Sequence, residues 1–502
     1  MQKRVPIFSF ALFSIFFISL VSAGNGCHDT DNNCAFGLTD GCDIKGDLTL
    51  APGDYDIGYG VDICASNIIF DCNSATLRDT RVLSNEFISI KNRNSTTIQN
   101  CIISLGGNVV REAIALTNSH NNKILSNTLL VEQESVSLGN SHNNLVQNNI
   151  ISVGGTFRKG SIKVGGNNNI INSNTITNTG DAISVGGDYN TITSNTLQKT
   201  VKGINIGGSW NLIENNYIAE SNEAISLGHS FYNPNANNLI TSNTLFNNSN
   251  GIAISGDTSG QQPPANNVFA YNLITGRGKT SGAGIYIAPY GSGPTINNSF
   301  IENEINFFGT GIYTSKSFNN IIKSNNIYNN LNGVYLQNSA NLLLISNIIA
   351  SNDYYGIRKE GNNNDETIIS QNKIANNNDS GIYFYYVANQ TVKDNIITGN
   401  KRYGIKIEGA WENLIYNNFF NNSINAKDSS TRPNNWNVTK DCSRRNILGV
   451  GCVGGNFWHD YTGQDNNGDG IGDTNLPYKS GGNINLGGDY LPLKKSRFPK
   501  MR

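Results

Sequence analysis

The sequence predicts an all-β protein, a single-stranded right-handed parallel β-helix in which short coils stack along one axis. Two recurring phrases lead to this fold. The first phrase is a six-residue motif, apolar-x-x-Asn-x-apolar, in which x is any residue, and it occurs thirteen times. The second lies between copies of the first and is a small residue, Ile or Val, any residue and an apolar residue, as in Gly203-Ile204-Asn205-Ile206. Self-similarity at a fixed period of roughly 20–50 residues is typical of solenoids.

The Asn of the first phrase recurs 21 to 31 residues apart, most often 22 or 23. In one coil after another it falls at a turn, and we expect the side-chain amides to form a ladder along the axis. This role is structural and needs no catalytic chemistry. The positions are Asn127, Asn149, Asn174, Asn195, Asn216, Asn243, Asn272, Asn303, Asn325, Asn347, Asn372, Asn395 and Asn418.

The second phrase alternates with period two around β-branched residues, which predicts a strand with one buried face. Each repeat therefore holds at least two short strands, separated by Asn and Gly turns that tolerate positive φ. A leucine-rich repeat shares the first phrase, but the other half of its repeat carries a helix. Here the other half alternates around Ile and contains few helix formers. With equivalent strands about 4.8 Å apart, thirteen coils predict a rod of roughly 60 Å.

Residues 1–23 are predicted to be a signal peptide. Lys3 and Arg4 precede an apolar run from Ile7 to Val21, and Val21-Ser22-Ala23 offers small residues for cleavage. An uncleaved membrane anchor is the alternative, although the run is short for a span of about 20 residues. No later stretch is apolar enough to cross a membrane. We expect a secreted, cell-surface or periplasmic protein that does not span the membrane once the signal is removed.

The remaining chain divides by composition. Residues 24–60 contain Cys, Asp and Gly and are predicted to form an N-terminal cap, 61–425 the β-helix, and 426–502 a C-terminal cap. Eight cysteines in an exported chain suggest disulfides. Their pairing does not follow from sequence, and Cys64 with Cys72 is one candidate pair. A zinc site is the alternative, but no pair of CxxC motifs occurs.

The charge balance argues against a nucleic-acid partner. The formal net charge is −1 and only 15% of residues are charged, whereas nucleic-acid binding needs a basic face. The exception is the C-terminal tail, which could attach the protein to an anionic surface or could be a solvated terminus. Its cations are Lys494, Lys495, Arg497, Lys500 and Arg502.

The residue after the Ile of the second phrase is predicted to point outward, so that successive copies form one column. The first part of this column is small and polar: Ala115, Ser137, Lys163, Ser184, Asn205, Ser226 and Ala253. The second part is aromatic and cationic: Tyr286, Tyr313, Tyr335, Arg358, Tyr383 and Lys406. Stacked Tyr rings offer a platform for sugar rings, and the cations can pair with uronic-acid carboxylates. We expect this second part to bind polysaccharide; alternatively, the rings simply pack on one another.

A second motif marks the C-terminal region. Gly454-Gly455-Asn456-Phe457-Trp458-His459-Asp460-Tyr461, with the later Gly488-Asp489-Tyr490-Leu491-Pro492-Leu493, resembles the closing motif of NosD-like β-helix proteins. The coils also resemble the wider carbohydrate-binding and sugar-hydrolase group with a pectate-lyase-like fold. The resemblance covers most of the chain, and its terminal motif is the more specific part. It implies, as a further alternative, a periplasmic accessory protein linked to assembly of a copper enzyme.

A copper site is not expected from the residues themselves. Copper prefers thiolate, thioether or imidazole ligands. Methionine occurs only at Met1 and Met501, and the cysteines are expected in disulfides. His120 and His142 occupy similar turns on adjacent coils and are the one hint of a site, but reuse of Ser-His in two hydrophilic, Asn-rich turns is the favoured explanation.

Catalysis has weaker sequence support than binding. The coils contain neither the Asp-Pro-His-Asp motif of alginate epimerases nor the Asp-pair and Gly-His-Gly pattern of polygalacturonases. Arg358, Lys406 and Glu408 are the best catalytic candidates, and a structural salt-bridge patch is the alternative. We therefore favour a non-catalytic protein that binds extracellular or cell-envelope polysaccharide. The competing hypothesis is a lyase or epimerase acting on acidic glycans.

A calcium loop is predicted near the C-terminus. Asp465, Asn467, Asp469 and Asp473 supply oxygen donors at positions 1, 3, 5 and 9 of an EF-hand-like loop, and Ile471 offers its carbonyl at position 7. Gly470 falls at position 6, where the backbone turns sharply. Position 12 is Leu476 instead of Glu, so Asp460 or Asp489 would complete the shell. The alternative is an Asp-Gly-rich turn without metal.

Overall fold

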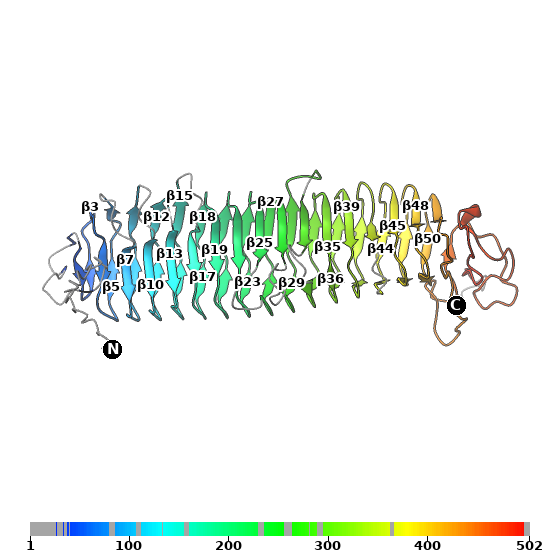
Figure 1. Ribbon diagram of the computed structural model, residues 1–502, viewed down its shortest axis with the longest axis horizontal. Helices are drawn as coiled ribbons and strands as arrows, with labels where there is room; N and C mark the ends of the chain where they lie inside the picture. Colours follow the sequence, from blue (N-terminus) through cyan, green and yellow to red (C-terminus); the bar gives the residue numbers. More distant parts are fainter. Residues whose placement is uncertain are drawn as a thin grey trace, which may run out of the picture.

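The chain forms one elongated rod of stacked coils (Figure 1). The computed structural model describes residues 27, 34, 38–39, 41–79, 86–106, 112–132, 134–154, 160–228, 235–255, 264–280, 282–288, 295–361 and 366–495. The predicted signal peptide lies outside them. Within this part of the chain the one helical element is the 3₁₀ turn η1 (Ser480–Gly482), which excludes a leucine-rich repeat. No helix of the described residues is long and apolar enough to cross a membrane.

The predicted right-handed parallel β-helix is confirmed, with three strands in each coil and three parallel sheets along the rod. Sheet A contains the second phrase and has 17 strands. In pairing order these are β1 (Asp43–Ile44), β4 (Val61–Ile63), β7 (Glu86–Lys91), β10 (Glu112–Thr117), β13 (Glu134–Gly139), β16 (Ile162–Val164), β19 (Asp181–Val185), β22 (Lys202–Ile206), β25 (Glu223–Leu227), β28 (Asn250–Ile254), β31 (Ala283–Ile287), β35 (Thr310–Ser315), β39 (Asn332–Gln337), β42 (Ile357–Glu360), β45 (Ser380–Tyr385), β48 (Tyr403–Glu408) and β51 (Ile424–Asp428).

Sheet B has 16 strands and holds the apolar residue before the recurrent Asn. Its strands are β2 (Leu48–Thr49), β5 (Ile69–Asp71), β8 (Thr97–Gln99), β11 (Lys123–Leu125), β14 (Leu145–Gln147), β17 (Ile170–Asn172), β20 (Thr191–Thr193), β23 (Leu212–Glu214), β26 (Leu239–Thr241), β29 (Val268–Ala270), β33 (Ser299–Ile301), β37 (Ile321–Lys323), β40 (Leu343–Ile345), β43 (Ile368–Ser370), β46 (Thr391–Lys393) and β49 (Leu414–Tyr416). A small extra pair, β32 (Thr295–Ile296) and β36 (Ser317–Phe318), lies in the connections before β33 and β37.

Sheet C holds the apolar residue after the Asn. Its strands are β3 (Asp54–Asp56), β6 (Thr76–Arg78), β9 (Ile102–Ser104), β12 (Thr128–Val131), β15 (Ile150–Val153), β18 (Thr175–Thr177), β21 (Thr196–Gln198), β24 (Tyr217–Ala219), β27 (Thr244–Asn248), β30 (Leu273–Gly276), β34 (Glu304–Asn306), β38 (Asn326–Tyr328), β41 (Ile348–Ala350), β44 (Lys373–Ala375), β47 (Ile396–Thr398), β50 (Phe419–Asn421) and β52 (Phe457–Trp458). The 17 strands of sheet A make 16 steps, or about 77 Å at 4.8 Å each. The rod is therefore longer than thirteen coils predict.

The core is a column of aliphatic side chains from all three sheets. Ile204 of β22, Ile213 of β23 and Ile218 of β24 represent one coil, and each is fully buried. The coils above and below place equivalent residues against them in register. Because every inward position packs on its neighbours along the axis, the stack replaces a globular core.

The predicted asparagine ladder is confirmed at the corner between sheets B and C. Asn243 shows its bonding: its amide Nδ2 donates to Oδ1 of Asn272 (3.0 Å) and to the carbonyls of Ile213 (3.0 Å) and Thr241 (2.9 Å). Its own Oδ1 accepts the backbone N–H of Asn216 (3.0 Å). Each amide thus satisfies buried backbone groups that a turn would otherwise leave without partners.

A second ladder, at the corner between sheets A and B, was not predicted. It contains Asn122, Asn144, Asn169, Asn190, Asn211, Asn238, Asn267, Asn298 and Asn320. The next two coils have Leu342 and Thr367 at the equivalent positions. There Lys359 points inward, and its ammonium donates to the carbonyl of Ser339 (2.5 Å) and the hydroxyl of Thr367 (3.0 Å). The buried lysine supplies the donor that the ladder amide gives elsewhere.

Four disulfides account for all eight cysteines: Cys27–Cys64, Cys34–Cys42, Cys72–Cys101 and Cys442–Cys452. The suggested Cys64–Cys72 pair is wrong. Cys72 and Cys101 follow β5 and β8 at the same corner of adjacent coils, so their side chains lie over each other. Cys64 follows β4 in sheet A, at a different corner.

The C-terminal segment, residues 429–495, adds one more rung to sheet C. Strand β52 pairs with β50, and Oδ1 of Asn456 accepts the N–H of Asn418, which continues the ladder. Trp458 stacks on Phe420 (ring centroids 4.5 Å apart) and on Tyr478 (4.6 Å). Its indole N–H donates to Asp489 (2.8 Å), a fully buried carboxylate whose pKa burial raises to about 7.

Candidate functional site

The predicted outward column lies on sheet A in unbroken register. Ala115 pairs with Ser137, and the pairing continues coil by coil to Tyr383 and Lys406. Tyr313 and Tyr335 are direct neighbours. Three positions before Ala115 and one after Lys406 extend the set, so that this central column contains Asp43, Asp62, Ser89, Ala115, Ser137, Lys163, Ser184, Asn205, Ser226, Ala253, Tyr286, Tyr313, Tyr335, Arg358, Tyr383, Lys406 and Lys427.

The variable connections all border sheet A. From β8–β9 to β49–β50, every connection between sheets B and C has two residues. From β4–β5 on, the connections from sheet A to sheet B range from five residues to thirteen, as after β28, and those from sheet C to sheet A vary as well. Insertions in a solenoid gather around the face that carries function. This places the candidate binding face on sheet A.

The tyrosine rings of the central column pack on one another. Tyr286 stacks on Tyr313 (centroids 5.3 Å apart, planes at 20°), and Tyr335 meets Tyr313 edge to face at 5.4 Å. Tyr383 stacks instead on Tyr355 (5.1 Å) and is buried. The ring faces are thus largely covered within the column, and the remaining surface of these rings lies at their edges.

The hydroxyl groups of this column donate to a parallel column on its flank. Tyr313 donates to Gln337 (2.6 Å), and Tyr383 donates to Glu408 (2.7 Å). Tyr335 donates in the same way to Glu360. Each acceptor lies one coil further along and two residues beyond the central position of its strand. The bonds tie successive coils together through their outer surface.

The two cations are paired and lie against aromatic rings. Arg358 forms an ion pair with Glu360, and its guanidinium carbon lies 4.7 Å from the ring centroid of Tyr335. Lys406 forms an ion pair with Glu408 (2.9 Å), and its ammonium lies 4.7 Å from the ring centroid of Tyr383. Such cation–π contacts fix the cations at the surface.

Burial and hydrogen bonds shift the pKa values of three groups in this part of the face. Burial and a hydrogen bond to Glu360 raise the pKa of Tyr335, and burial with a bond to Glu408 raises that of Tyr383. Partial burial alone would raise the pKa of Glu408, but bonds from Tyr383 and Lys406 lower it overall. A general acid or base works best with a pKa near the operating pH. These shifts move the groups away from that range.

More exposed rings surround the column. Tyr354, Tyr385 and Tyr386 are 51%, 39% and 50% exposed. Tyr385 meets Tyr386 edge to face at 4.5 Å, and Tyr354 lies 6.3 Å from Tyr355. Tyr385 and Tyr355 neighbour the column in sequence, whereas Tyr354 and Tyr386 lie in turns that a strand pattern does not reveal.

An acidic column was missed by the sequence reasoning. Glu86, Glu112 and Glu134 pair in register on sheet A, three residues before the central column. Burial raises the pKa of Glu112, and the nearby carboxylates of Glu134 and Glu86 add to the effect. In the sequence, these glutamates stand directly before the second phrase, as Glu112 does before Ala113, and comparing that position from coil to coil would have revealed the column. The face is therefore acidic towards its N-terminal end and aromatic and cationic towards its C-terminal end.

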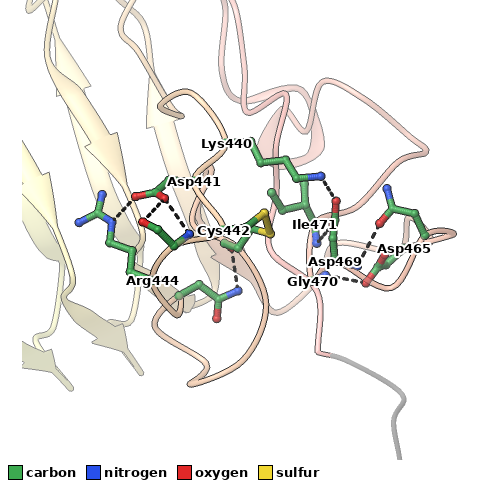
Figure 2. The surroundings of a disulfide bond; sticks show 12 residues. Lys440, Asp441, Cys442, Arg444, Asp465, Asp469, Gly470 and Ile471 are labelled. Carbon is green, nitrogen blue, oxygen red and sulfur yellow. Dashed lines mark hydrogen bonds and ion pairs between the residues drawn. A yellow bond between two sulfur atoms is a disulfide. The ribbon is translucent and has the colours of Figure 1, made fainter.

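The predicted calcium loop folds around its own acidic side chains. Asp465 accepts the N–H groups of Gly468 (2.7 Å) and Gly470 (2.9 Å), and Asp469 accepts that of Ile471 (2.9 Å). Asp473 accepts the N–H of Asn466 (2.7 Å). Figure 2 shows Lys440 reaching this loop from beside the Cys442–Cys452 disulfide, where it forms an ion pair with Asp469.

His120 and His142 act as turn residues. Their rings stack 5.1 Å apart, and Nδ1 of each accepts a backbone N–H from the next coil: that of His142 (3.1 Å) and that of Asn167 (2.8 Å). Asn94 and Asn167 do the same with their side-chain oxygens. The imidazoles therefore replace turn asparagines.

The side chains do not fit a copper site. All eight cysteines form disulfides and therefore offer no thiolate. The stacked imidazoles of His120 and His142 use Nδ1 for backbone contacts. Across the part of the chain that the structure describes, no three His, Cys, Asp or Glu side chains are grouped to hold a metal.

Solved structures with similar coils include tailspike proteins of the E. coli bacteriophage HK620. One, in complex with a pentasaccharide, is 14% identical over 71% of this chain and 69% of its own, with a TM-score of 0.46. A double mutant of the same tailspike is 13% identical over 70% and 69%, with a TM-score of 0.45. At these values no ligand or activity is carried over to this chain. No curated protein sequence matches it.

The resemblance noted in the closing motif extends over the coils. The chain matches the family described as "Periplasmic copper-binding protein (NosD)" over residues 44–235, 190–310 and 308–463. These overlapping matches cover most of the rod and reach into the motif around Trp458. The chain belongs to the NosD family.

Proposed function

We propose that this protein is exported and binds an extracellular or cell-envelope polysaccharide, without catalysis, on the C-terminal half of sheet A. The observation that carries the proposal is the central column, in which six successive coils place Tyr, Tyr, Tyr, Arg, Tyr and Lys at one position, all but the buried Tyr383 partly exposed. The exposed rings of Tyr354, Tyr385 and Tyr386 offer faces on which sugar rings can stack. Four disulfides support an oxidising compartment.

The charges of this face favour an acidic glycan only modestly. Arg358, Lys406 and Lys427 give three positive charges, and Glu360 and Glu408 give two negative ones, so one positive charge is in excess. Both carboxylates are engaged by tyrosine hydroxyls and cations. A sugar carboxylate would therefore meet preorganised cations whose side chains are already ordered.

The binding prediction concerns the two cations. In the double variant Arg358→Ala, Lys406→Ala, retention of acidic glycans on an array should fall at least about tenfold, equivalent to 1.4 kcal/mol. Lys163→Ala is the matched control, because Lys163 occupies the same column in its N-terminal half. That variant should bind as the unmodified chain does.

The same proteins decide between binding and lysis. Incubated with polygalacturonate or alginate, the unmodified chain should generate no ultraviolet absorbance of unsaturated products. Product formation that disappears in the double variant would establish a lyase and refute the non-catalytic proposal. An array without retained glycans would refute the binding proposal.

We also propose that the loop 465–473 binds Ca²⁺ and stabilises the C-terminal segment. Asp465, Asn467, Asp469 and Asp473 would supply side-chain oxygens and Ile471 its carbonyl, which suits a hard cation. Calcium would have to displace the ammonium of Lys440 from Asp469. Lys440 is thus a built-in competitor of the metal.

Calcium removal is expected to lower the melting temperature of the chain by several degrees, because bound metal stabilises only the folded loop. Asp465→Asn should abolish the difference between calcium and chelator. Lys440→Met should bind calcium more tightly by calorimetry, since the competing ammonium is gone. A melting temperature that is the same with calcium and with chelator would count against the site.

A further inference from the structure

Two exposed aromatic rings stand side by side at the corner between sheets A and B. Tyr189 and Trp210 are 56% and 54% exposed, and they lie in consecutive coils. Their ring centroids are 6.2 Å apart and their planes differ by 9°. The pair is separate from the central column and presents a parallel aromatic surface to solvent.

The backbone makes these residues costly. Both have positive φ, 58° for Tyr189 and 61° for Trp210. Other coils place Asn at this turn position, as at Asn121, Asn168 and Asn237, each with φ near 57°. Asn tolerates this region, whereas a bulky side chain there is an outlier. Stacking of two rings returns only about 0.5–1.5 kcal/mol, so the fold alone does not call for aromatic residues here.

Close backbone packing keeps the surroundings of the rings bare. Gly187 and Gly208 precede Tyr189 and Trp210 by two residues. A Cβ at either glycine would come within 2.0 Å of a carbonyl oxygen of the preceding coil, that of Gly166 or Gly187. These two positions therefore have to be glycine, and no side chain at either of them covers the neighbouring rings.

The neighbouring chemistry suits a neutral sugar. Asp188 is the one charged residue within 186–191 and 207–212, and one of its oxygens accepts the N–H of Ser209 (2.7 Å). The outward sheet B residues Ile170 and Leu239 add exposed aliphatic surface along the same corner. Aromatic and aliphatic groups can pack against the C–H face of a pyranose, and a carboxylate can accept hydrogen bonds from the hydroxyl groups of the sugar. A uronate would be repelled by Asp188, since no cation lies in either turn.

We propose that Tyr189 and Trp210 form a second glycan subsite, which stacks a neutral pyranose ring and accepts its hydroxyl groups at Asp188. This subsite goes beyond the sheet A face and does not depend on it. What sets these two residues apart is that the strained positions lie in consecutive coils and hold two exposed, parallel rings, a combination that a function of the pair explains.

Trp210 provides its own probe. Of the four tryptophans, Trp436 and Trp458 are buried and Trp411 is partly covered, whereas Trp210 is exposed. Titration of the full chain with cellohexaose, maltohexaose and chitohexaose should shift the emission of Trp210 with at least one of them. Oligogalacturonate should give no such shift. Tyr189→Asn should weaken the binding of that neutral hexasaccharide at least tenfold by calorimetry, and Trp210→Asn should do the same.

The stability of these variants separates a binding role from a structural one. Because Asn fits the turn, Tyr189→Asn and Trp210→Asn should melt at or above the temperature of the unmodified chain. Tyr271→Asn is the matched control. Tyr271 is 59% exposed and has a φ of 58°, but it follows β29 and lies at the corner between sheets B and C. It should gain stability equally and keep glycan binding.

Three results would overturn the subsite. They are no response to any neutral hexasaccharide, a response to oligogalacturonate alone, or a Trp210→Asn variant that melts lower but binds unchanged. The Arg358→Ala, Lys406→Ala variant should keep the fluorescence response in full. Failure of the sheet A proposal would therefore leave this one standing, and the reverse also holds.

Discussion

Replacing Trp458 with alanine is expected to destabilise the C-terminal segment by about 3–5 kcal/mol, the usual cost of truncating a buried aromatic residue. Trp458 is 1% exposed and lies between Phe420 of the last complete coil and Tyr478 of the segment. The substitution also removes the indole donor from the buried carboxylate of Asp489. Both losses act on the rung that covers β50.

Hydrogen exchange resolves this effect better than a global melting curve, because a solenoid can open at one end while its other coils stay folded. Amides of β49, β50 and β51 should exchange faster in Trp458→Ala, and those of sheet A around β22 should not change. Tyr490→Ala is the control, since Tyr490 lies in the same segment but is 53% exposed. Equal exchange in both variants would show that the aromatic stack does not secure the end of the rod.

The coil architecture and the central column could be predicted because both follow from periodic chemistry. A residue type that recurs in register must lie over its copies, so the order Tyr286, Tyr313, Tyr335 already implied a stack. The number of strands was harder to predict. The first phrase spans a corner, with Ile213 in β23 and Ile218 in β24, so one phrase contains two strands.

Features that depend on broken periodicity escaped prediction. Asn456 continues the ladder 38 residues after Asn418, because a long insertion carries the Cys442–Cys452 disulfide between them. The interruption of the second asparagine ladder at Leu342 was equally hidden. The missing hydrogen-bond donor is supplied by Lys359, a residue of sheet A whose side chain points inward although a lysine is expected to point outward.

The candidate site was predicted only in part, because the sequence reasoning followed one column where the face has three. Glu360 and Glu408 lie two residues beyond Arg358 and Lys406, and their pairing neutralises much of the charge offered to a ligand. Tyr189 and Trp210 were missed for a different reason. They occupy turn positions at which the repeat has Asn, and the deviation becomes meaningful only once their positive φ is known.

The ladder itself gives the second large prediction. Asn243→Ala is expected to lower the free energy of unfolding by about 2–4 kcal/mol, because buried polar groups that lose their partners cost about 1–3 kcal/mol each. The buried N–H of Asn216 loses its acceptor, and the carbonyl of Ile213 loses the amide donor. Asn272 keeps its other partners, so the damage stays within two neighbouring coils.

Asn243→Asp separates the loss of the hydrogen-bond acceptor from the loss of the hydrogen-bond donor. Aspartate keeps an acceptor for Asn216 but cannot donate to Ile213 or Asn272, and it buries a charge. Its denaturation midpoint at neutral pH should lie at or below that of Asn243→Ala. Asn326→Ala, on the exposed face of β38, should change stability by no more than about 0.5 kcal/mol. If Asn243→Ala unfolded like Asn326→Ala, the ladder amides would be dispensable, and the stacking of isoleucines alone would hold the coils in register.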